Sequence, residues 1–552
     1  MLLLLCTAYV LSGFVGRDAW KSADMTALGY MLELAQGVAR WFTPTLMGVA
    51  PDNPALLPYW LGAWAIAVAP SWLPADVAVR IPFGLVLALA FVSTWYATYY
   101  LARRPQAQPV AFAFGGEARP TDYARAMADG GLLAFMACLG LAQLSHETTP
   151  ALAQLSFTAL FFYAMGALPY RRPGPAMAAL LGLAGLTLSG APALALLLGL
   201  GSAAIHGADR WEEAAHENSS QAKPRRHIAW ESTLLVLGSV GVAVLGYALD
   251  LWRWKIALPQ ATWAHWNGHA QLLIWFTWPA WPLALWTLWR WRRHLFNHRI
   301  SRHLALPLWF VVVCVAATLT SASSDRTLLL ALPALSTLAA FALPTLKRRV
   351  AALIDWFTLL FFSGCGFTIW VVWIAMQTGF PSQPAANVVR LAPGFEAGFS
   401  TLAFAIAVAA TLVWAWLVKW RVGRHRAAIW KSLVLPAGGA ALCWLLLMTL
   451  WMPLLNYAQS YVALVDRTAK ELDGPGCLEV LKLDPGQIAA FQFYGQRQLQ
   501  PIQPTPVCPW LLADPEPGMS IPPGVNPSQW SLKALVKHPV DAGEAVLVFQ
   551  RR

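Results

Sequence analysis

The sequence predicts a mainly α-helical membrane protein with about thirteen transmembrane helices, interfacial helices in its first outer loop and a soluble α/β domain at its C-terminus. Three observations lead to this prediction. Of the 552 residues, 58% are hydrophobic and only 12% are charged, and the mean hydropathy is +0.51. The apolar residues form runs of about 20 residues, the length that crosses about 30 Å of hydrocarbon. The charged residues gather in short loops between these runs and in the chain after Pro453.

Thirteen apolar runs are predicted to span the membrane, and the basic loops between them indicate the orientation. If the first loop lies outside, every strongly basic loop falls on the inner side, which is the usual arrangement in membrane proteins. The formal charge of +12 therefore does not indicate a nucleic-acid partner, because the basic residues do not share one soluble face. Two short, Gly-rich runs, 175–188 and 190–206, could instead form one helical hairpin or a re-entrant pair. The predicted spans are residues 1–15, 78–101, 128–145, 150–168, 175–188, 190–206, 232–250, 271–290, 304–320, 327–345, 352–376, 398–419 and 430–452.

These spans form a predicted transmembrane domain over residues 1–452, and the chain after it is predicted to be a soluble α/β domain over residues 453–552. In this second part, charged residues on a helical stretch are followed by short β-like runs at 477–483 and 545–549, with Pro-rich turns between them. An odd number of spans places this domain on the outer side, which is the periplasm for a protein of the bacterial inner membrane. Cys477 and Cys508 are the two cysteines outside the apolar runs, so we expect them to form a disulfide in this oxidising compartment.

The first outer loop, residues 16–60, carries the candidate chemistry. It holds Asp18, Asp24 and Asp52 together with Lys21, an unusual density of charge beside the bilayer. A membrane enzyme that deprotonates an acceptor hydroxyl needs a carboxylate at this level, where water reaches the site and apolar protein can shift the pKa of the acid. The outer side also offers His146, Glu147, His265, His269, Asp325, Arg326 and Glu396.

Five short motifs follow one another along the chain. They are Trp41 to Gly48, Asp52 to Trp60, Val79 to Phe83, Gly268 to Pro282, and Ser323 to Pro333. In this order they resemble the W-x-x-P-x-x-x-G, E-K-P-P-L-x-Y-W, A-R-x-P-S, H-x-x-P-W-x-Y-x-P and S-x-x-K-x-x-x-Y-x-L-P elements of the bacterial aminoarabinose transferases. Those enzymes are C-type membrane glycosyltransferases, with the GT-C fold, and the protein O-mannosyltransferases are their relatives. Thirteen spans and an outer soluble domain also match, so the resemblance covers nearly the whole chain.

The resemblance implies an inverting glycosyltransferase that uses a polyprenyl-phosphate-linked sugar at the periplasmic face of the inner membrane. The acceptor would be lipid A, another glycolipid or a protein, and membrane lipids would surround the spans. No cofactor is implied beyond the lipid-linked donor.

The resemblance also indicates catalytic residues. The leading acid of the family lies twenty residues before the Pro of its first motif, which is Asp24 before Pro44 here. Asp24 is therefore the predicted catalytic carboxylate, with Asp18 as an alternative that could instead cap a short interfacial helix. Asp52 matches the acid of the E-K-P-P motif if one residue is deleted before it, although it could simply form an Asx turn before Pro54.

Substrate-binding residues are less directly indicated. Glu147 occupies the place of an acidic turn in the family, or else caps a helix, and His146 precedes it. The chain departs from the family at Asn53 and in the run 187–190, where lysines that hold the donor phosphate are expected. A phosphate in a water-poor site needs other cationic or N–H partners. The candidates are Lys21, Arg80, Arg253, Lys255, His269 and Arg326.

Each of these cations also has a plainer interpretation. Arg80 could close a buried ion pair, Lys21 could lie on a solvated face, and Arg326 could be an interfacial cation whose charge reaches water. His269 could pack at the membrane interface among the tryptophans around it. A divalent metal held by the outer histidines with Asp52 or Glu147 is a further alternative, but no third ligand lies close in sequence, so no metal is assigned.

Two other function classes remain open at this stage. A polytopic transporter or lipid flippase would also carry charges and broken helices in the membrane. The chain shows no duplicated half, and its acids gather at one face rather than at the middle of the membrane. A non-catalytic membrane scaffold with a sensor domain is the third possibility.

Overall fold

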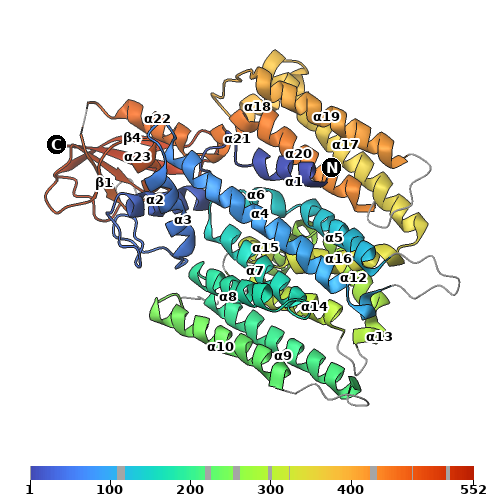
Figure 1. The fold of residues 1–552 in the computed structure, drawn as a ribbon. Coiled ribbons are helices and arrows are strands. Elements are labelled where there is room, and N and C mark those ends of the chain that lie inside the picture. The colour runs from blue at the N-terminus through green and yellow to red at the C-terminus, as the bar shows by residue number, and fades with distance from the viewer. Residues whose placement is uncertain are drawn as a thin grey trace.

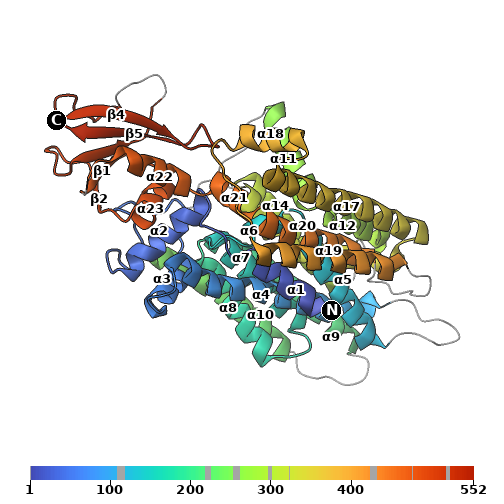
Figure 2. The same cartoon turned by 90° about the horizontal axis from the view of Figure 1, so that it is seen from above.

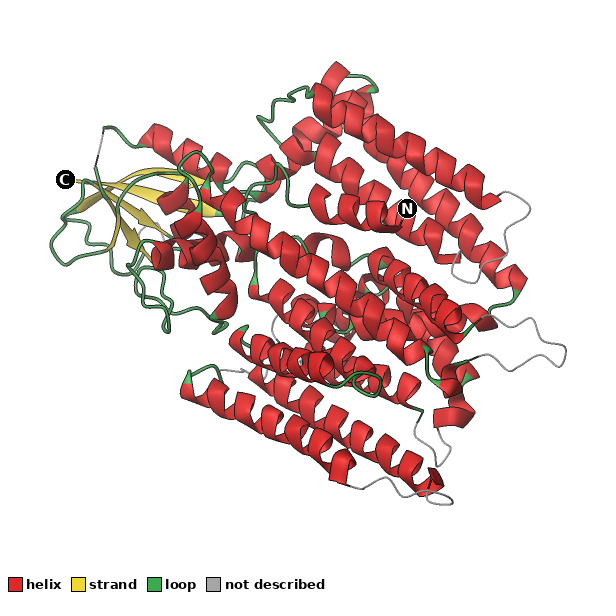
Figure 3. Ribbon diagram, viewed as in Figure 1, coloured by secondary structure: helices red, strands yellow, loops and turns green. Residues whose placement is uncertain are grey.

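The computed structural model of the chain describes residues 2–108, 119–217, 226–252, 262–295, 301–321, 324–422, 432–474, 476–516 and 522–552. Arg253, Lys255 and Ser323 lie outside these residues. Figure 3 shows that the described strands all belong to the C-terminal part of the chain, whereas the part before it is helical. A mainly α fold with a small C-terminal sheet is therefore confirmed.

Each of the thirteen predicted spans overlaps a helix. Seven helices in the described ranges are long and apolar enough to cross a membrane, and α20 with α21, bent by 76° between them, could be an eighth. The other apolar helices are shorter, so the number thirteen stays a prediction. The seven are α4 (Ala75–Ala102), α7 (Pro150–Ala167), α9 (Pro192–Glu217), α10 (Arg226–Ala248), α14 (Arg302–Leu319), α17 (Arg348–Thr378) and α19 (Thr401–Val422), and the bent pair is α20 (Val434–Leu450) with α21 (Met452–Gln459).

Apart from α5, which has 18 residues, the remaining helices of this part are shorter than the seven. The two Gly-rich runs form two separate helices, α8 and α9, joined by a tight turn, and the choice between two spans and one hairpin stays a prediction. Gly182 of α8 lets α7 approach, because a Cβ there would lie 2.8 Å from the Cβ of Phe161. These helices are α1 (Leu2–Ser12), α5 (Pro120–Ala137), α6 (Leu141–Leu144), α8 (Pro173–Leu188), α11 (Trp263–Phe276), α12 (Ala280–Arg290), α13 (Arg292–Leu295), α15 (Ser324–Leu329), α16 (Leu332–Ala342) and α18 (Ser382–Leu391), with 3-10 turns η1 (Pro105–Ala107) and η2 (Leu343–Thr345).

Three predicted spans, 128–145, 271–290 and 327–345, are wrong as continuous helices. They break between α5 and α6, between α11 and α12, and between α15 and α16. The break after α5 and the break after α11 are hydrogen-bonded to each other. The N–H of Gly140 donates to the carbonyl of Phe276 at 2.9 Å, and the N–H of Leu139 donates to the carbonyl of Trp278 at 3.1 Å. A Cβ at Gly140 would lie 2.2 Å from the Phe276 ring, so only glycine permits this contact. Freed backbone groups inside a membrane protein need such internal partners.

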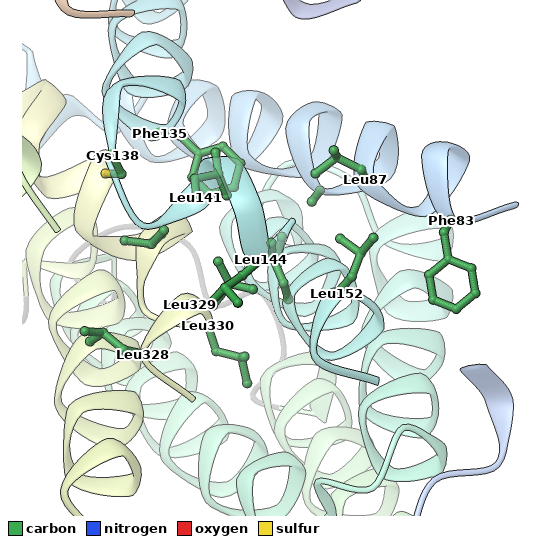
Figure 4. Close-up of a cluster of buried hydrophobic side chains, with 14 of the residues drawn as sticks. Phe83, Leu87, Phe135, Cys138, Leu141, Leu144, Leu152, Leu328, Leu329 and Leu330 are labelled. Carbon is green, nitrogen blue, oxygen red and sulfur yellow. The ribbon is translucent and has the colours of Figure 1, made fainter. Parts of the chain in front are cut away.

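A cluster of buried apolar side chains packs against the broken segments at α6 and α15. In Figure 4, Leu141 and Leu144 of α6 lie close to Leu329, Leu330 and Leu152, which come from α15, the turn after it and α7. All five side chains are buried. This cluster fixes the short segment between α6 and α7, which carries the candidate residues Glu147 and His146.

The C-terminal part folds as predicted into helices and a mixed sheet. Its strands have the order β2-β1-β3-β5-β4, parallel from β2 to β3 and antiparallel from β3 to β4. Cys477, directly before β1, and Cys508, shortly before β3, form a disulfide with a Cα–Cα distance of 5.1 Å. The elements are α22 (Val462–Glu471), β1 (Leu478–Leu481), α23 (Pro485–Phe493), β2 (Leu499–Pro501), β3 (Trp510–Ala513), β4 (Trp530–Lys537) and β5 (Ala545–Arg551).

Residues 16–68, which include the predicted first outer loop, form two helices, α2 (Ala23–Ala35) and α3 (Leu57–Val68), and α2 packs against the C-terminal part. Figures 1 and 2 both show α2, α3 and the sheet together at one end of the helical bundle. A Cβ at Gly29 of α2 would lie 2.6 Å from the Cβ of Ala489 in α23, so the two helices meet with almost no side chain between them. One hydrophobic core runs from the helical bundle through α2 into the C-terminal part.

Candidate active site

Asp24 lies in the first turn of α2, where the partial positive charge of the helix N-terminus favours a carboxylate. The residue is only 4% exposed. Its Oδ1 accepts hydrogen bonds from the N–H and the hydroxyl of Thr148, at 2.7 and 2.6 Å. Its Oδ2 accepts from the Arg17 guanidinium at 2.9 Å and from the N–H of Trp20 at 3.4 Å. Four hydrogen-bond donors therefore surround this buried carboxyl.

Arg17 is the charge partner of Asp24, and the sequence reasoning did not single it out. Its side chain is 1% exposed. The guanidinium also donates to the carbonyl of His146 at 3.1 Å and lies 4.1 Å from the centre of the Trp20 ring. Burial lowers the pKa of Arg17, and the charges of Asp24 and Glu147 oppose this shift. The sequence signal that could have indicated Arg17 is its positive charge seven residues before Asp24, the predicted base.

Glu147 and Arg326 form a second ion pair beside the first. The guanidinium of Arg326, in α15, donates to Oε2 of Glu147 at 3.1 Å. Burial raises the pKa of Glu147, and the charge of Asp24 adds to this effect while Arg326 and Arg17 oppose it. Glu147 does not cap α7, because the N-cap of that helix is Thr149. The segment between α6 and α7 thus touches both ion pairs, through Thr148 and Glu147.

His269 lies near the second pair. Its Nδ1 lies 2.9 Å from the carbonyl of His265, one helical turn earlier in α11. Its Nε2 lies 3.5 Å from the hydroxyl of Ser324, two residues before Arg326. The structure therefore brings α11 and α15 together at this side of the site.

His146 has a different environment. Its Nε2 lies 3.0 Å from the carbonyl of Tyr9, and its ring packs 5.0 Å from that of Trp444. Burial lowers its pKa to about 4, so the ring is neutral at pH 7 and brings no positive charge to a phosphate.

Asp18 and Arg80 lie near Arg17, but neither side chain is among the hydrogen-bond partners of Asp24. Arg80 pairs with Asp76, one turn earlier in α4, at 2.9 Å; this is the buried ion pair named above as the plainer interpretation. Burial raises the pKa of the Asp18 carboxyl, while the charge of Arg80 lowers it. Asp18 does not cap α2, whose N-cap is Ser22.

The positions of the two expected lysines meet in space. Asp52 and Asn53 are exposed, and the chain directly after them runs along the turn between α8 and α9. The N–H of Leu56 donates to the carbonyl of Leu188 at 2.8 Å, and a Cβ at Gly190 would lie 2.4 Å from the carbonyl oxygen of Pro54. The runs 52–54 and 187–190, where the two family lysines are expected, therefore lie side by side. Neither run contains a lysine.

Lys21 is held by the C-terminal part of the chain. Its ammonium lies 2.9 Å from the carboxylate of Asp541, and its side chain is 10% exposed. Lys21 therefore does not lie on a solvated face. In the described ranges, no three His, Cys, Asp or Glu side chains are grouped so that they could hold a metal ion.

Comparison with solved structures identifies the fold. No protein-family model matches the sequence, and no curated protein matches it either. The structure is similar to that of ArnT, an aminoarabinose transferase, from Cupriavidus metallidurans in the apo state, with a TM-score of 0.55 and 13% identity over 99% of this chain and 97% of that chain. ArnT bound to undecaprenyl phosphate matches with the same TM-score, 12% identity and the same coverage. An oligosaccharyltransferase from Archaeoglobus fulgidus, tethered to an acceptor peptide, matches with a TM-score of 0.43 and 11% identity over 90% of this chain and 63% of that chain.

Proposed function

We propose that this chain is a glycosyltransferase of the bacterial inner membrane that takes its sugar from a polyprenyl-phosphate-linked donor. The observation that carries the proposal is the buried Arg17–Asp24 pair in the first loop of a chain with the fold of ArnT from end to end. A buried, hydrogen-bonded acid in that loop is what proton transfer from an acceptor needs. The structure of ArnT with undecaprenyl phosphate supports a lipid-linked donor.

Asp24 is the proposed general base. The acceptor oxygen forms a bond to the anomeric carbon while the bond from that carbon to the donor phosphate breaks, which inverts the configuration. The acceptor proton moves to Asp24. Because all of the donors to Asp24 are within the protein, an acceptor hydroxyl must replace one of them, and the N–H of Trp20 at 3.4 Å is the most distant.

The leaving phosphate needs a cation, and Arg326 is the proposed one. Arg80 and Lys21 are paired with Asp76 and Asp541, whereas the carboxylate partner of Arg326 belongs to the segment that also binds Asp24. Arg326 is 32% exposed in its side chain and pairs with Glu147, beside Asp24. Its Nε is buried without a hydrogen-bond partner among the described residues, so a phosphate oxygen would satisfy it.

The proposed setting follows from the predicted topology. Residues 1–452 are the transmembrane domain, residues 453–552 lie in the periplasm, and the reaction takes place at the periplasmic face. The acceptor is lipid A, another glycolipid or a protein, and Asp18 or Asp52 assists Asp24 as the base.

The experiment that tests this function compares cells that express the wild-type chain with cells that express Asp24→Asn. Asp122→Asn is the matched control, because Asp122 is an exposed acid that pairs with the exposed Arg125 at 3.5 Å. Mass spectrometry of envelope glycolipids and glycoproteins should show a sugar adduct in the wild type and in the control but not in Asp24→Asn at equal protein level. Normal adducts in Asp24→Asn would remove Asp24 from the proposal, and no adduct in any strain would favour a transport function.

A further inference from the structure

We infer that Asn456 is a positioning residue that holds the loop bearing Arg17 and Asp24 in its working conformation. For its catalytic part, this inference rests on the proposed function. Asn456 lies in α21, the short helix that follows the bend after α20. It is more than 430 residues away from that loop in sequence, as the separations of 436 to 440 in its hydrogen bonds show.

The side-chain amide of Asn456 makes three hydrogen bonds to the loop. Its Oδ1 accepts from the N–H of Asp18 at 3.1 Å and from the indole N–H of Trp20 at 3.0 Å. Its Nδ2 donates to the carbonyl of Gly16 at 3.1 Å. Only a side chain with a donor and an acceptor on one planar group can make this set.

These three bonds surround the partner of the catalytic acid. Arg17 lies between Gly16 and Asp18, and its guanidinium rests on the Trp20 ring. Trp20 in turn donates its backbone N–H to Asp24. Asn456 therefore determines where Arg17 and Trp20 present their donors, although it makes no hydrogen bond to Asp24 itself in the structure.

The end of α21 continues the same attachment. The N–H of Lys21 donates to the carbonyl of Gln459 at 2.7 Å, and Trp20 forms an isolated β-bridge with Ser460. The backbone contacts keep the loop beside α21 when the side chain at 456 is changed. The Asn456 amide then sets the finer geometry, and a displacement of about 1 Å of a catalytic group costs on the order of 100-fold in rate.

Asn456→Leu and Asn456→Asp test this role. Leu has a similar size and makes none of the three bonds. An ionised Asp keeps the acceptor for Asp18 and Trp20 but places a second oxygen against the Gly16 carbonyl. A protonated Asp carries an O–H that can donate there, so its function should return as the pH falls.

Tyr457→Phe is the matched control. Tyr457 is the next residue of α21, and its hydroxyl donates to the carbonyl of Pro393 at 2.7 Å, away from the loop. The variant therefore removes one hydrogen bond of the same helix without touching residues 16–20.

The measurements are sugar transfer by the purified full chain in nanodiscs with a polyprenyl-phosphate sugar, and hydrogen exchange of peptides that cover residues 16–20. For Asn456→Leu we expect a fall of about 10- to 100-fold in kcat, an unchanged KM for the lipid donor, and faster exchange in the loop. The activity of Asn456→Asp relative to wild type should rise from pH 8 to pH 5. Asp18 also titrates and would interact with an acid at 456, so the same comparison is made in the Asp18→Asn background.

Three results would overturn the inference. They are wild-type kcat in Asn456→Leu, wild-type exchange of the loop in that variant, or the same loss of kcat in Tyr457→Phe. The exchange measurement is independent of activity. If the wild-type chain transfers no sugar, the proposed function fails, and exchange at Asp18 and Trp20 still decides whether Asn456 holds the loop.

Discussion

Replacing Asp24 by Asn should cost both stability and activity, and the two losses can be separated. The side chains of Arg17 and Asp24 are 1% and 5% exposed, so solvent does not screen the pair. In Asp24→Asn the new amide N–H₂ faces two donors, the Arg17 guanidinium and the Trp20 N–H, and leaves the Arg17 charge buried without its partner. Breaking a buried ion pair in this way costs about 3–5 kcal/mol.

The double variant Arg17→Gln/Asp24→Asn removes the unpaired charge. Two neutral amides can bond to each other, and replacing both members of a buried pair is often close to neutral. We therefore expect the free energy of unfolding of the double variant to lie within about 2 kcal/mol of the wild-type value. Asp24→Asn alone should have a clearly lower free energy of unfolding. The assay is thermal unfolding of the purified chain in one detergent, followed by sugar transfer at a temperature at which all variants are folded.

Activity decides between a catalytic and a structural role for Asp24. A catalytic base cannot be replaced by an amide, so the double variant should stay inactive although it is stable again. If the double variant regains transfer together with stability, Asp24 serves only as the partner of Arg17. If Asp24→Asn is as stable as the wild type, the free-energy cost of breaking the buried Arg17–Asp24 pair is much smaller than the value derived from its burial.

Three further predictions concern the surroundings of the site. Burial raises the pKa of Glu147, and the charge of Arg326 opposes this shift. Arg326→Gln should therefore raise the pKa of Glu147 further in the folded state. The resulting loss of thermal stability should be largest at pH 8 and shrink as the pH falls toward 4.5, because the protonated carboxyl no longer has a buried charge. Cys477→Ser with Cys508→Ser opens a link with a sequence separation of 31 and should lower the free energy of unfolding by about 2–4 kcal/mol, seen as a lower unfolding temperature under non-reducing conditions. Gly29→Ala places a methyl group 2.6 Å from a side chain of α23, and the expected cost is about 1–3 kcal/mol with faster proteolysis of the C-terminal part.

Each of these predictions has its own control. The double variant Glu147→Gln/Arg326→Gln should lose the pH dependence of the stability change. A loss of stability that is the same at every pH in Arg326→Gln would contradict its attribution to the Glu147 carboxyl. Treatment of the wild type with a reductant should reproduce the effect of the cysteine variants. Gly364→Ala is the matched glycine change inside a helix, because a Cβ there meets nothing within 4 Å, and it should not lower stability.

The helices of the membrane part could be predicted because apolar runs of this length have one favourable structure in hydrocarbon. What the sequence did not show was where these runs break. The break at Gly140 depends on the Phe276 carbonyl and ring, which lie far along the chain. Hydropathy averages over such a contact, so the runs 128–145 and 271–290 looked continuous.

The site was predictable only in part, for a related reason. Asp24 was indicated by its distance from the first motif, but its donor Arg17 belongs to no motif, and Thr148 was noticed only as a neighbour of Glu147. Thr148 is separated from Asp24 by 124 residues, and Asn456 from the loop that it holds by 436 or more. Partners of this kind become visible only when the bundle brings α21 and the segment between α6 and α7 beside the first loop.

In the proposed reaction, Asp24 takes the proton of the acceptor while the sugar passes from the lipid phosphate to it. The most direct measurement is mass spectrometry of the lipid donor pool, with the purified full chain in nanodiscs, a polyprenyl-phosphate sugar and an extract of envelope acceptors. For the wild type we predict that free polyprenyl phosphate appears in a one-to-one ratio with glycosylated acceptor, and that Asp24→Asn gives neither product. Equal release by both proteins, or intact donor with the wild type for every polyprenyl-phosphate sugar supplied, would contradict the claim.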